Sequence, residues 1–196
     1  HLIIPTTDMG MQISYNGGES WRRMEITGTN YDIYNTCYDL YMDRSTKDLV
    51  YGIWSNRHDA PYSPTQSDTG WTQGKFGIST DGGITWDLSY STGLPEDCIP
   101  VRMSVQENGD ALTIAVATFN RGFYISYDSG KTFSSINSGM NTENGLIWGE
   151  DVILTGDTVY CLTAPYTRDN DMVSAELYIY DLNSKTTTQA DLGELV

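Results

Sequence analysis

The chain has 196 residues, of which 39% are hydrophobic and 19% charged, which excludes a disordered chain and is enough for a domain with a sizeable core. Its formal net charge of −15 excludes nucleic acid and anionic membrane surfaces as expected partners, because both recruit clustered Lys and Arg side chains. No stretch reaches the roughly 18 apolar residues of a membrane span.

The composition favours strands and turns. Glycine (19 residues) and tyrosine (14 residues) are abundant and no long helical period is visible, so the sequence predicts an all-β chain. Cys37, Cys98 and Cys161 form no Cys-x-x-Cys pair, so no zinc site, other metal or cofactor is expected, and their disulfide state stays open. Cys161 lies in an apolar run and is expected to be a buried thiol. The chain starts at His1 without a signal peptide, as a processed secreted protein or a fragment does.

The predicted strands fall into four successive groups. The first group is Leu2–Thr6, Met11–Tyr15 and Trp21–Ile26. The second is Thr36–Met42, Leu49–Ser55, Lys75–Thr80 and Thr85–Tyr90. The third is Val101–Gln106, Leu112–Thr118, Gly122–Tyr127 and Thr132–Ile136. The fourth is Ile147–Leu154, Thr158–Ala164, Glu176–Leu182 and Thr186–Ala190. The groups divide one domain into four units with the boundaries 1–27 (partial), 28–92, 93–138 and 139–196.

One turn motif recurs, with the form Ser-x-Asp/Asn-x-Gly-x-Ser/Thr-aromatic. Its copies are Ser14–Trp21, Ser79–Trp86 and Ser126–Phe133. The Asp or Asn side chain can accept backbone N–H groups of a tight hairpin, the glycine can take a positive φ, and the aromatic ring can pack between sheets. The motif therefore predicts structural roles for Asn16, Asp81 and Asp128, and a degenerate copy is expected at residues 176–186.

This motif resembles the Asp-box, or BNR repeat, of sialidase-type β-propellers. The resemblance implies four-stranded antiparallel blades with an Asp-box hairpin between the third and fourth strands, and the box spacing agrees with a blade of roughly 40–50 residues plus insertions. The first blade lacks its innermost strand, so the chain is expected to be part of a propeller of six to eight blades. A small four-bladed ring is the alternative. The remaining blades or a second propeller domain are expected partners.

The rim opposite the boxes carries the links between second and third strands, where sialidase-type enzymes hold their active site. Aromatic, amide and basic side chains in these links are typical of a glycan site, and ordinary polar loops are the alternative. The expected substrate-binding residues are Trp54, Arg57, Tyr62, Trp71, Asn120, Arg121 and Arg168. Their aromatic members would stack on sugar rings or pack the long insertion of the second blade.

Three residues of these links are the expected catalytic groups. The segment Thr7–Gly10 resembles the Thr-Asp-x-Gly segment before the first box of xyloglucanase-type glycoside hydrolases, which implies that Asp8 is a catalytic carboxylate. The partner carboxylate of that family comes from a second propeller. Within this chain Asp59 is the best second carboxylate, since glycoside hydrolysis usually needs two, and His58 is its neighbour. The alternatives are a turn role for Asp8 and a plain hydrogen-bonding role for His58.

These features favour a carbohydrate-active propeller, secreted or periplasmic, that binds a polysaccharide or glycan. The favoured activity is that of a glycoside hydrolase with paired carboxylates. The alternatives are a non-catalytic Asp-box propeller that binds a glycan or protein partner, as sortilin-type propellers do, and a structural module of a larger extracellular protein. Sialidase activity is not expected, because no arginine precedes Ile4 and Pro5 to complete the Arg-Ile-Pro motif of that family.

Overall fold

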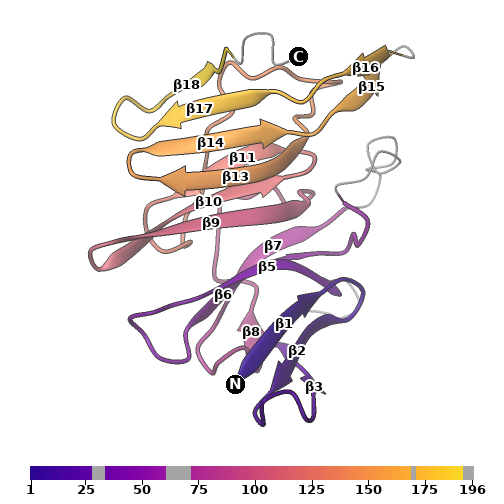
Figure 1. Cartoon of the computed structure of the whole chain (residues 1–196), viewed down its shortest axis with the longest axis vertical. Coiled ribbons are helices and arrows are strands. Elements are labelled where there is room, and N and C mark those ends of the chain that lie inside the picture. Colours follow the sequence, from indigo (N-terminus) through magenta and orange to yellow (C-terminus); the bar gives the residue numbers. More distant parts are fainter. Residues whose placement is uncertain (28–33, 61–71, 169–170, 192–196) are drawn as a thin grey trace.

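The computed structural model describes residues 1–27, 34–60, 72–168 and 171–191, which form eighteen strands and no helix (Figure 1). Within these ranges no helix is long and apolar enough to cross a membrane. The chain is all-β, and its strands form antiparallel sheets of the kind expected for propeller blades. Blades one to four follow one another in chain order.

Blades three and four are separate four-stranded sheets, whereas blade one, with three strands, and blade two, with four, are joined with β4 in one eight-stranded sheet. Blade one consists of β1 (Leu2–Thr6), β2 (Gly10–Ser14) and β3 (Arg22–Arg23). Blade two consists of β5 (Thr36–Met42), β6 (Val50–Ser55), β7 (Gly74–Ser79) and β8 (Thr85–Asp87). Blade three consists of β9 (Pro100–Asn108), β10 (Ala111–Thr118), β11 (Gly122–Ser126) and β12 (Ser134–Ser135). Blade four consists of β13 (Gly149–Thr155), β14 (Thr158–Thr163), β17 (Leu177–Asp181) and β18 (Thr186–Gln189).

Two features depart from the predicted strands. The range predicted as one strand over Trp21–Ile26 is divided, because β3 pairs with β2 whereas β4 (Glu25–Thr27) leaves blade one and pairs in parallel with β8 of blade two. The link between β14 and β17 also contains a hairpin that was not predicted, formed by β15 (Tyr166–Arg168) and β16 (Asp171–Val173). Both features depend on the path of the chain between sheets. The alternation of apolar residues within a strand does not encode that path.

The blades stack face to face. We call the sheet face that points toward the next blade in the chain the forward face, and the opposite one the back face. The forward face of blade two meets the back face of blade three in one apolar cluster, which includes Tyr51, Ile53, Phe76, Leu112, Ile114, Val116 and Phe133. Because the central strands are covered on both faces, all six residues of β6 are buried instead of alternating with exposed ones.

A second connection links neighbouring blades at their outer edge. The segment that leaves each blade runs along the outermost strand of the next one, as β4 does along β8. After blade two, the Thr92 N–H donates to the Lys131 carbonyl over 3.0 Å, and Thr92 forms a parallel bridge with Thr132. After blade three, the Ile136 carbonyl accepts the Thr187 hydroxyl over 2.7 Å. Each blade interface therefore combines an apolar face with a backbone contact at its edge.

The motif aspartates make the same set of hydrogen bonds in boxes two and three. Asp81 accepts the Thr85 N–H over 2.9 Å and the Thr85 hydroxyl over 2.6 Å. Asp128 accepts the corresponding groups of Thr132 over 2.9 and 2.6 Å. In box one the Asn16 amide accepts the Ser20 N–H over 3.0 Å and donates to its hydroxyl over 2.9 Å. These contacts close hairpins, which agrees with a structural role for the motif.

The turn expected as a fourth copy is a different hairpin. Asp181 accepts the N–H groups of Asn183 and Ser184 over 3.1 and 2.7 Å, which are closer in sequence than the partners of the other boxes. In boxes one to three a serine hydroxyl two positions before the Asp or Asn accepts a glycine N–H, as Ser79 does from Gly83 over 2.8 Å. Ile179 occupies that position in blade four and has no hydroxyl.

The box carboxylates make the fold sensitive to acid. Burial alone would raise the pKa of Asp81, but hydrogen bonds from the Thr85 hydroxyl and N–H outweigh burial and hold that pKa below its usual range. Such a group stabilises the folded state fully above its unfolded pKa of about 3.9 and loses that contribution as pH falls through the lower folded value.

We therefore expect Asp81→Asn to cost less than about 1.5 kcal/mol at neutral pH, because box one shows that an amide closes the same turn. The difference should shrink as pH falls below about 3.9 and through the lower folded pKa of Asp81, because protonation removes the ionic contribution. Urea unfolding of both proteins across this pH range measures the difference. A destabilisation that persists unchanged in acid would contradict the ionic contribution.

Candidate functional site

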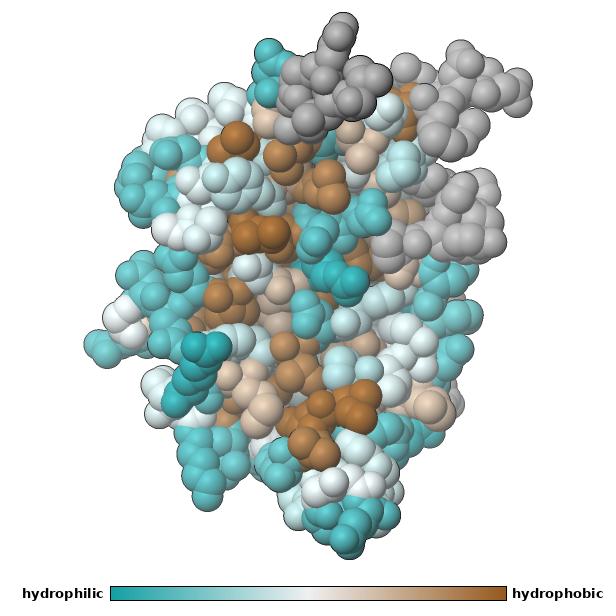
Figure 2. Space-filling model, viewed as in Figure 1, coloured by the Kyte–Doolittle hydropathy of each residue, from teal (hydrophilic) through white to brown (hydrophobic). Residues whose placement is uncertain are grey.

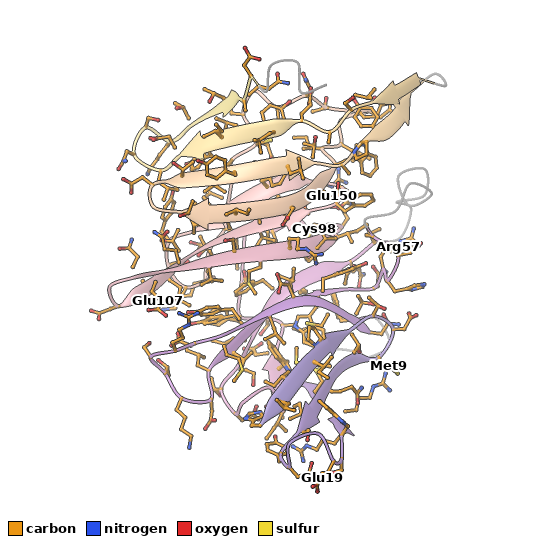
Figure 3. The ribbon with its side chains drawn as sticks, in the orientation of Figure 1. Met9, Glu19, Arg57, Cys98, Glu107 and Glu150 are labelled. Carbon is orange, nitrogen blue, oxygen red and sulfur yellow. The ribbon has the colours of Figure 1, made fainter. Side chains whose placement is uncertain are left out.

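The rim opposite the Asp-box hairpins carries the links that the sequence singled out. In Figure 1 the β1–β2 turn and the β15–β16 hairpin lie at the right-hand rim, whereas the β17–β18 hairpin lies at the left. Met9 and Arg57 lie at the right-hand rim in Figure 3, and Glu107 of the β9–β10 hairpin lies at the opposite one. The fold therefore brings the links of blades one and two to one edge of the molecule.

Repeated backbone contacts position these links. The first residue of the third strand donates its N–H to the segment that enters the next blade. Gly10 donates to Asn35 over 2.5 Å, Gly74 to Glu96 over 3.2 Å, and Gly122 to Ile147 over 2.9 Å. The rims of blades one, two and three are thereby each fixed to the blade that follows.

Asp8 is held in the β1–β2 turn by its backbone. Its φ is +62°, in the left-handed region that residues other than glycine, asparagine and aspartate enter rarely. Its N–H donates to the Thr36 hydroxyl of β5 over 3.2 Å, and Thr36 is fully buried. The carboxylate takes no part in this anchoring contact and is available to other groups.

The carboxylate of Asp8 contacts the imidazole of His58. The distance from Asp8 Oδ1 to His58 Nδ1 is 3.0 Å, and the two side chains are 56% and 55% exposed. Asp8 comes from blade one and His58 from the link after β6 of blade two, so the contact spans two blades. An Nδ1–H donated to the carboxylate would fix both the orientation of Asp8 and the tautomer of the ring.

Tyr38 organises the link that contains Arg57, His58 and Asp59. Its hydroxyl donates to the Arg57 carbonyl over 2.8 Å and accepts the Ala60 N–H over 3.0 Å, so it holds both ends of the segment. The pKa of Tyr38 is raised to about 12, chiefly by burial and to a lesser extent by the negative charges of Asp59 and Asp8, while the hydrogen bond with Ala60 lowers it. Both carboxylates therefore lie within electrostatic reach of one phenol.

Arg121 lies in the β10–β11 turn, where it pairs with Asp97. Its Nε donates to Asp97 Oδ1 over 3.1 Å, and a terminal nitrogen contacts the other carboxylate oxygen. The hydrogen bond from Arg121 holds the pKa of Asp97 below its usual range. The pairing is bidentate, a geometry that fixes the guanidinium plane and leaves less of it for an anionic ligand.

Two of the predicted substrate-binding residues are buried and used within the fold, so their prediction is corrected. Asn120 accepts the Ile99 N–H over 2.8 Å and donates to the Asp97 carbonyl over 2.6 Å. Trp54 is fully buried and meets Trp86 edge to face, with ring centroids 5.1 Å apart, so it cannot stack on a sugar. Strand β6 is central and covered on both faces, and this burial was not apparent from its sequence.

The structure describes only some of the other predicted binding residues. Arg168 ends β15 at the same rim and faces Asp171 of β16 in the strand register. Tyr62 and Trp71 lie outside the described residues.

Three residues that contribute to the site were not predicted, namely Thr36, Tyr38 and Asp97. Their partners lie 28, 19 and 24 positions away along the chain, and local motifs carry no signal of such pairing.

The described residues contain no cluster of three or more His, Cys, Asp or Glu side chains that could hold a metal ion. The three cysteines are free and buried. Burial raises the pKa of both Cys98 and Cys161 to about 12, so their thiols stay protonated at neutral pH. Burial of Cys161 confirms the prediction made from its apolar run.

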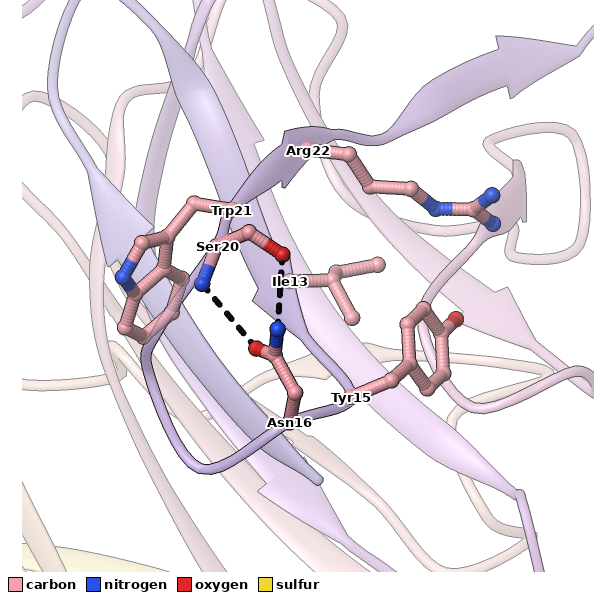
Figure 4. A pocket seen from close by; sticks show the side chains of 6 residues that line it. All are labelled: Ile13, Tyr15, Asn16, Ser20, Trp21 and Arg22. Atoms are coloured by element: carbon pink, nitrogen blue, oxygen red, sulfur yellow. Dashed lines mark hydrogen bonds between the residues drawn. The ribbon is translucent and has the colours of Figure 1, made fainter.

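A hollow of about 180 Å³ lies away from this rim, at box one. Trp21 and Tyr15 flank it in Figure 4, and its other lining residues are Ile13, Asn16, Ser20 and Arg22. The polar side chains of Asn16 and Ser20 bond to each other, and Arg22 lies over the Tyr15 ring at 5.2 Å. The hollow is a product of the hairpin and shares no residue with the Asp8–His58 contact.

Comparison with known proteins identifies the repeat. The family described as BNR/Asp-box repeat matches residues 78–88, which contain box two. No curated protein matches the chain. Among solved structures, a GH74 enzyme of Niastella koreensis is 16% identical with a TM-score of 0.46, over 95% of this chain and 35% of that one.

Two further GH74 structures resemble the chain. An ancestral GH74 enzyme is 12% identical with a TM-score of 0.43, over 98% of this chain and 29% of its own length. The GH74 xyloglucanase of Xanthomonas campestris is 12% identical with a TM-score of 0.41, over 95% and 35%. The chain thus spans about a third of the length of the structures it matches.

Proposed function

We propose that this chain is the carbohydrate-active part of a propeller that hydrolyses a polysaccharide outside the cell. The observation that carries the proposal is the 3.0 Å contact between Asp8 and His58 at the rim opposite the Asp-boxes. A half-exposed carboxylate with an oriented imidazole beside it and a second carboxylate on the same link offers the groups that glycoside hydrolysis needs.

The roles follow from the chemistry of a glycosidic bond. One carboxyl group protonates the leaving oxygen, and a carboxylate on the other side of the ring activates water or attacks the anomeric carbon. Asp8 and Asp59 are assigned to these two tasks, because they belong to the β1–β2 turn and to the link after β6, which lie at the same rim. His58 contacts Asp8 directly and is assigned to position it, while Arg57 and Arg168 are assigned to substrate hydroxyl groups.

One observation favours a second candidate, a non-catalytic module that binds a glycan or a protein. The Asp8 and His58 side chains are both more than half exposed. Catalytic carboxylates usually lie in clefts that exclude water, whereas a binding surface can be open.

The experiment measures hydrolysis and binding separately. Wild-type protein is incubated with a panel of soluble polysaccharides, new reducing ends are counted, and affinity electrophoresis in the same polymers detects binding. Release of reducing ends supports hydrolysis. Binding without release favours the binding module. The absence of both binding and release would contradict both candidates.

We expect His58→Gln to lower kcat about tenfold on the best substrate with KM little changed, because a flexible amide replaces the ring that contacts the Asp8 carboxylate over 3.0 Å. The split between kcat and KM, measured per folded molecule, separates positioning of Asp8 from a merely structural role, which would leave both constants unchanged. An unaltered kcat would contradict the role given to His58.

A further inference from the structure

Strand β5, the innermost strand of blade two, supports both partners of the Asp8–His58 contact. At its start, Thr36 accepts the Asp8 N–H over 3.2 Å. Two residues later, the Tyr38 hydroxyl bonds to the link at residues 57–60, which carries His58. Asp8 and His58 come from different blades, but one strand fixes the separation of their supports.

A bulge in β5 places Tyr38. The register of β5 against β6 shifts between Cys37 and Asp39, which makes Tyr38 the extra residue. The innermost strands of blades three and four have the same shift, and their extra residues are Val101 and Glu150. A bulge re-aims the side chain that it carries and is common beside active sites. Because Val101 and Glu150 lack a hydroxyl group, the bulge is a feature of the blades, whereas the phenol is specific to blade two.

The Tyr38 ring is fixed by packing. It packs against the apolar cluster between blades two and three and against a second cluster, which runs through blades three and four and includes Ala60. Its hydroxyl donates to the Arg57 carbonyl over 2.8 Å and accepts the Ala60 N–H over 3.0 Å. A side chain whose rotamer is locked by packing can hold a site within narrow limits. The two bonds bracket His58 and Asp59, so the phenol controls both ends of their segment.

The link needs such an internal partner because it lies close to water. His58 is 55% exposed, and in Figure 2 hydrophilic side chains line the right-hand rim, where Figure 3 places Arg57. Water competes for the backbone groups of an exposed segment and does not favour one conformation of it. The 3.0 Å contact with Asp8 requires one conformation.

We propose that Tyr38 is a positioning residue of the candidate site, whose hydroxyl keeps the His58 imidazole against the Asp8 carboxylate. It acts through His58 and transfers no proton itself. Its effect on turnover rests on the proposed function, whereas its effect on the His58–Asp8 contact does not. A merely structural hydroxyl would stabilise the link and leave that contact unchanged, so the contact itself has to be measured.

Tyr38→Phe keeps the ring and removes both hydrogen bonds. The chain has two histidines, so nitrogen NMR of the imidazoles resolves His58 beside His1, an internal reference whose Nε2 lies 3.0 Å from the Gly82 carbonyl oxygen. At about pH 8, above the usual imidazole pKa of about 6.5, we expect wild-type His58 to carry its proton on Nδ1, the atom that contacts Asp8. In Tyr38→Phe the His58 ring should exchange between its two tautomers, and the His1 signals should not change.

On a substrate that the wild type hydrolyses, Tyr38→Phe should lower kcat about 10–100-fold with KM little changed, because a small displacement of a positioned group slows the reacting step. Tyr41→Phe is the matched control. Tyr41 lies on the same strand, but its hydroxyl donates to Glu107 Oε1 over 3.1 Å, at the opposite rim. This control should leave the His58 signals and turnover unchanged, and circular dichroism should show both variants folded.

His58 signals that are identical in Tyr38→Phe and wild type would overturn the inference. A fall in kcat without a change in these signals would also overturn it, because the hydroxyl would then act on the substrate itself. A wild type without hydrolytic activity would contradict the proposed function alone, and the His58 signals would still decide whether Tyr38 positions the ring.

Discussion

Replacing Asp8 by asparagine is expected to lower polysaccharide hydrolysis by about 10²–10⁴-fold while leaving the fold intact. Asparagine has the shape of aspartate but cannot donate or accept the proton that acid–base catalysis transfers. The anchoring bond to Thr36 comes from the backbone N–H and remains, as does a hydrogen bond to His58. The side chain is 56% exposed, so little stability depends on it. The loss should therefore appear in kcat, with substrate affinity largely retained.

Asp48→Asn provides the matched control. Asp48 is also an aspartate with a φ of +62°, and its side chain is 45% exposed, but it lies in the β5–β6 turn. Its carbonyl accepts the Gly82 N–H of box two over 2.8 Å, which places it at the Asp-box rim. Turnover by this variant should match wild type. Unchanged turnover in Asp8→Asn would end the assignment of Asp8 as a catalytic residue.

The sequence predicted the strands well where local signals determine them. The observed β1 and β5 occupy the predicted ranges Leu2–Thr6 and Thr36–Met42. Each box hairpin has strong local chemistry, because Asp or Asn, glycine and Ser or Thr satisfy the turn among themselves. Where the chain passes between blades the prediction was wrong, since the step from β3 to β4 depends on a partner strand that follows about 60 residues later.

The candidate site was predicted in part for the same reason. The links were placed at one rim by topology, and the structure brings Asp8 and His58 into contact there. Trp54 was misassigned because an aromatic residue at the end of a strand has the same sequence signature whether its sheet is open or covered on both faces. Asp97 was missed because it lies in the link between blades two and three, whereas its partner Arg121 lies in the β10–β11 turn within blade three.

Replacing Trp86 by alanine is expected to cost about 3–5 kcal/mol of folding free energy. The ring is fully buried between blades one and two, meets Trp54 edge to face, and donates its N–H to Gly83 over 3.0 Å. Its removal leaves a large cavity in a cluster whose strands are held on both sides, so collapse around the void is limited. For a chain of this size the melting temperature should fall by about 6–20 °C.

Trp21→Ala separates the effect of the box motif from the effect of burial. Trp21 occupies the same box position and makes the same indole hydrogen bond, but it is 40% exposed. It should cost less than about 1 kcal/mol, because most of its truncated surface was already in water. Differential scanning calorimetry of both variants at one concentration makes the comparison. Equal losses would show that the hairpin itself, and not the packing of blade on blade, gives the aromatic residue its effect on stability.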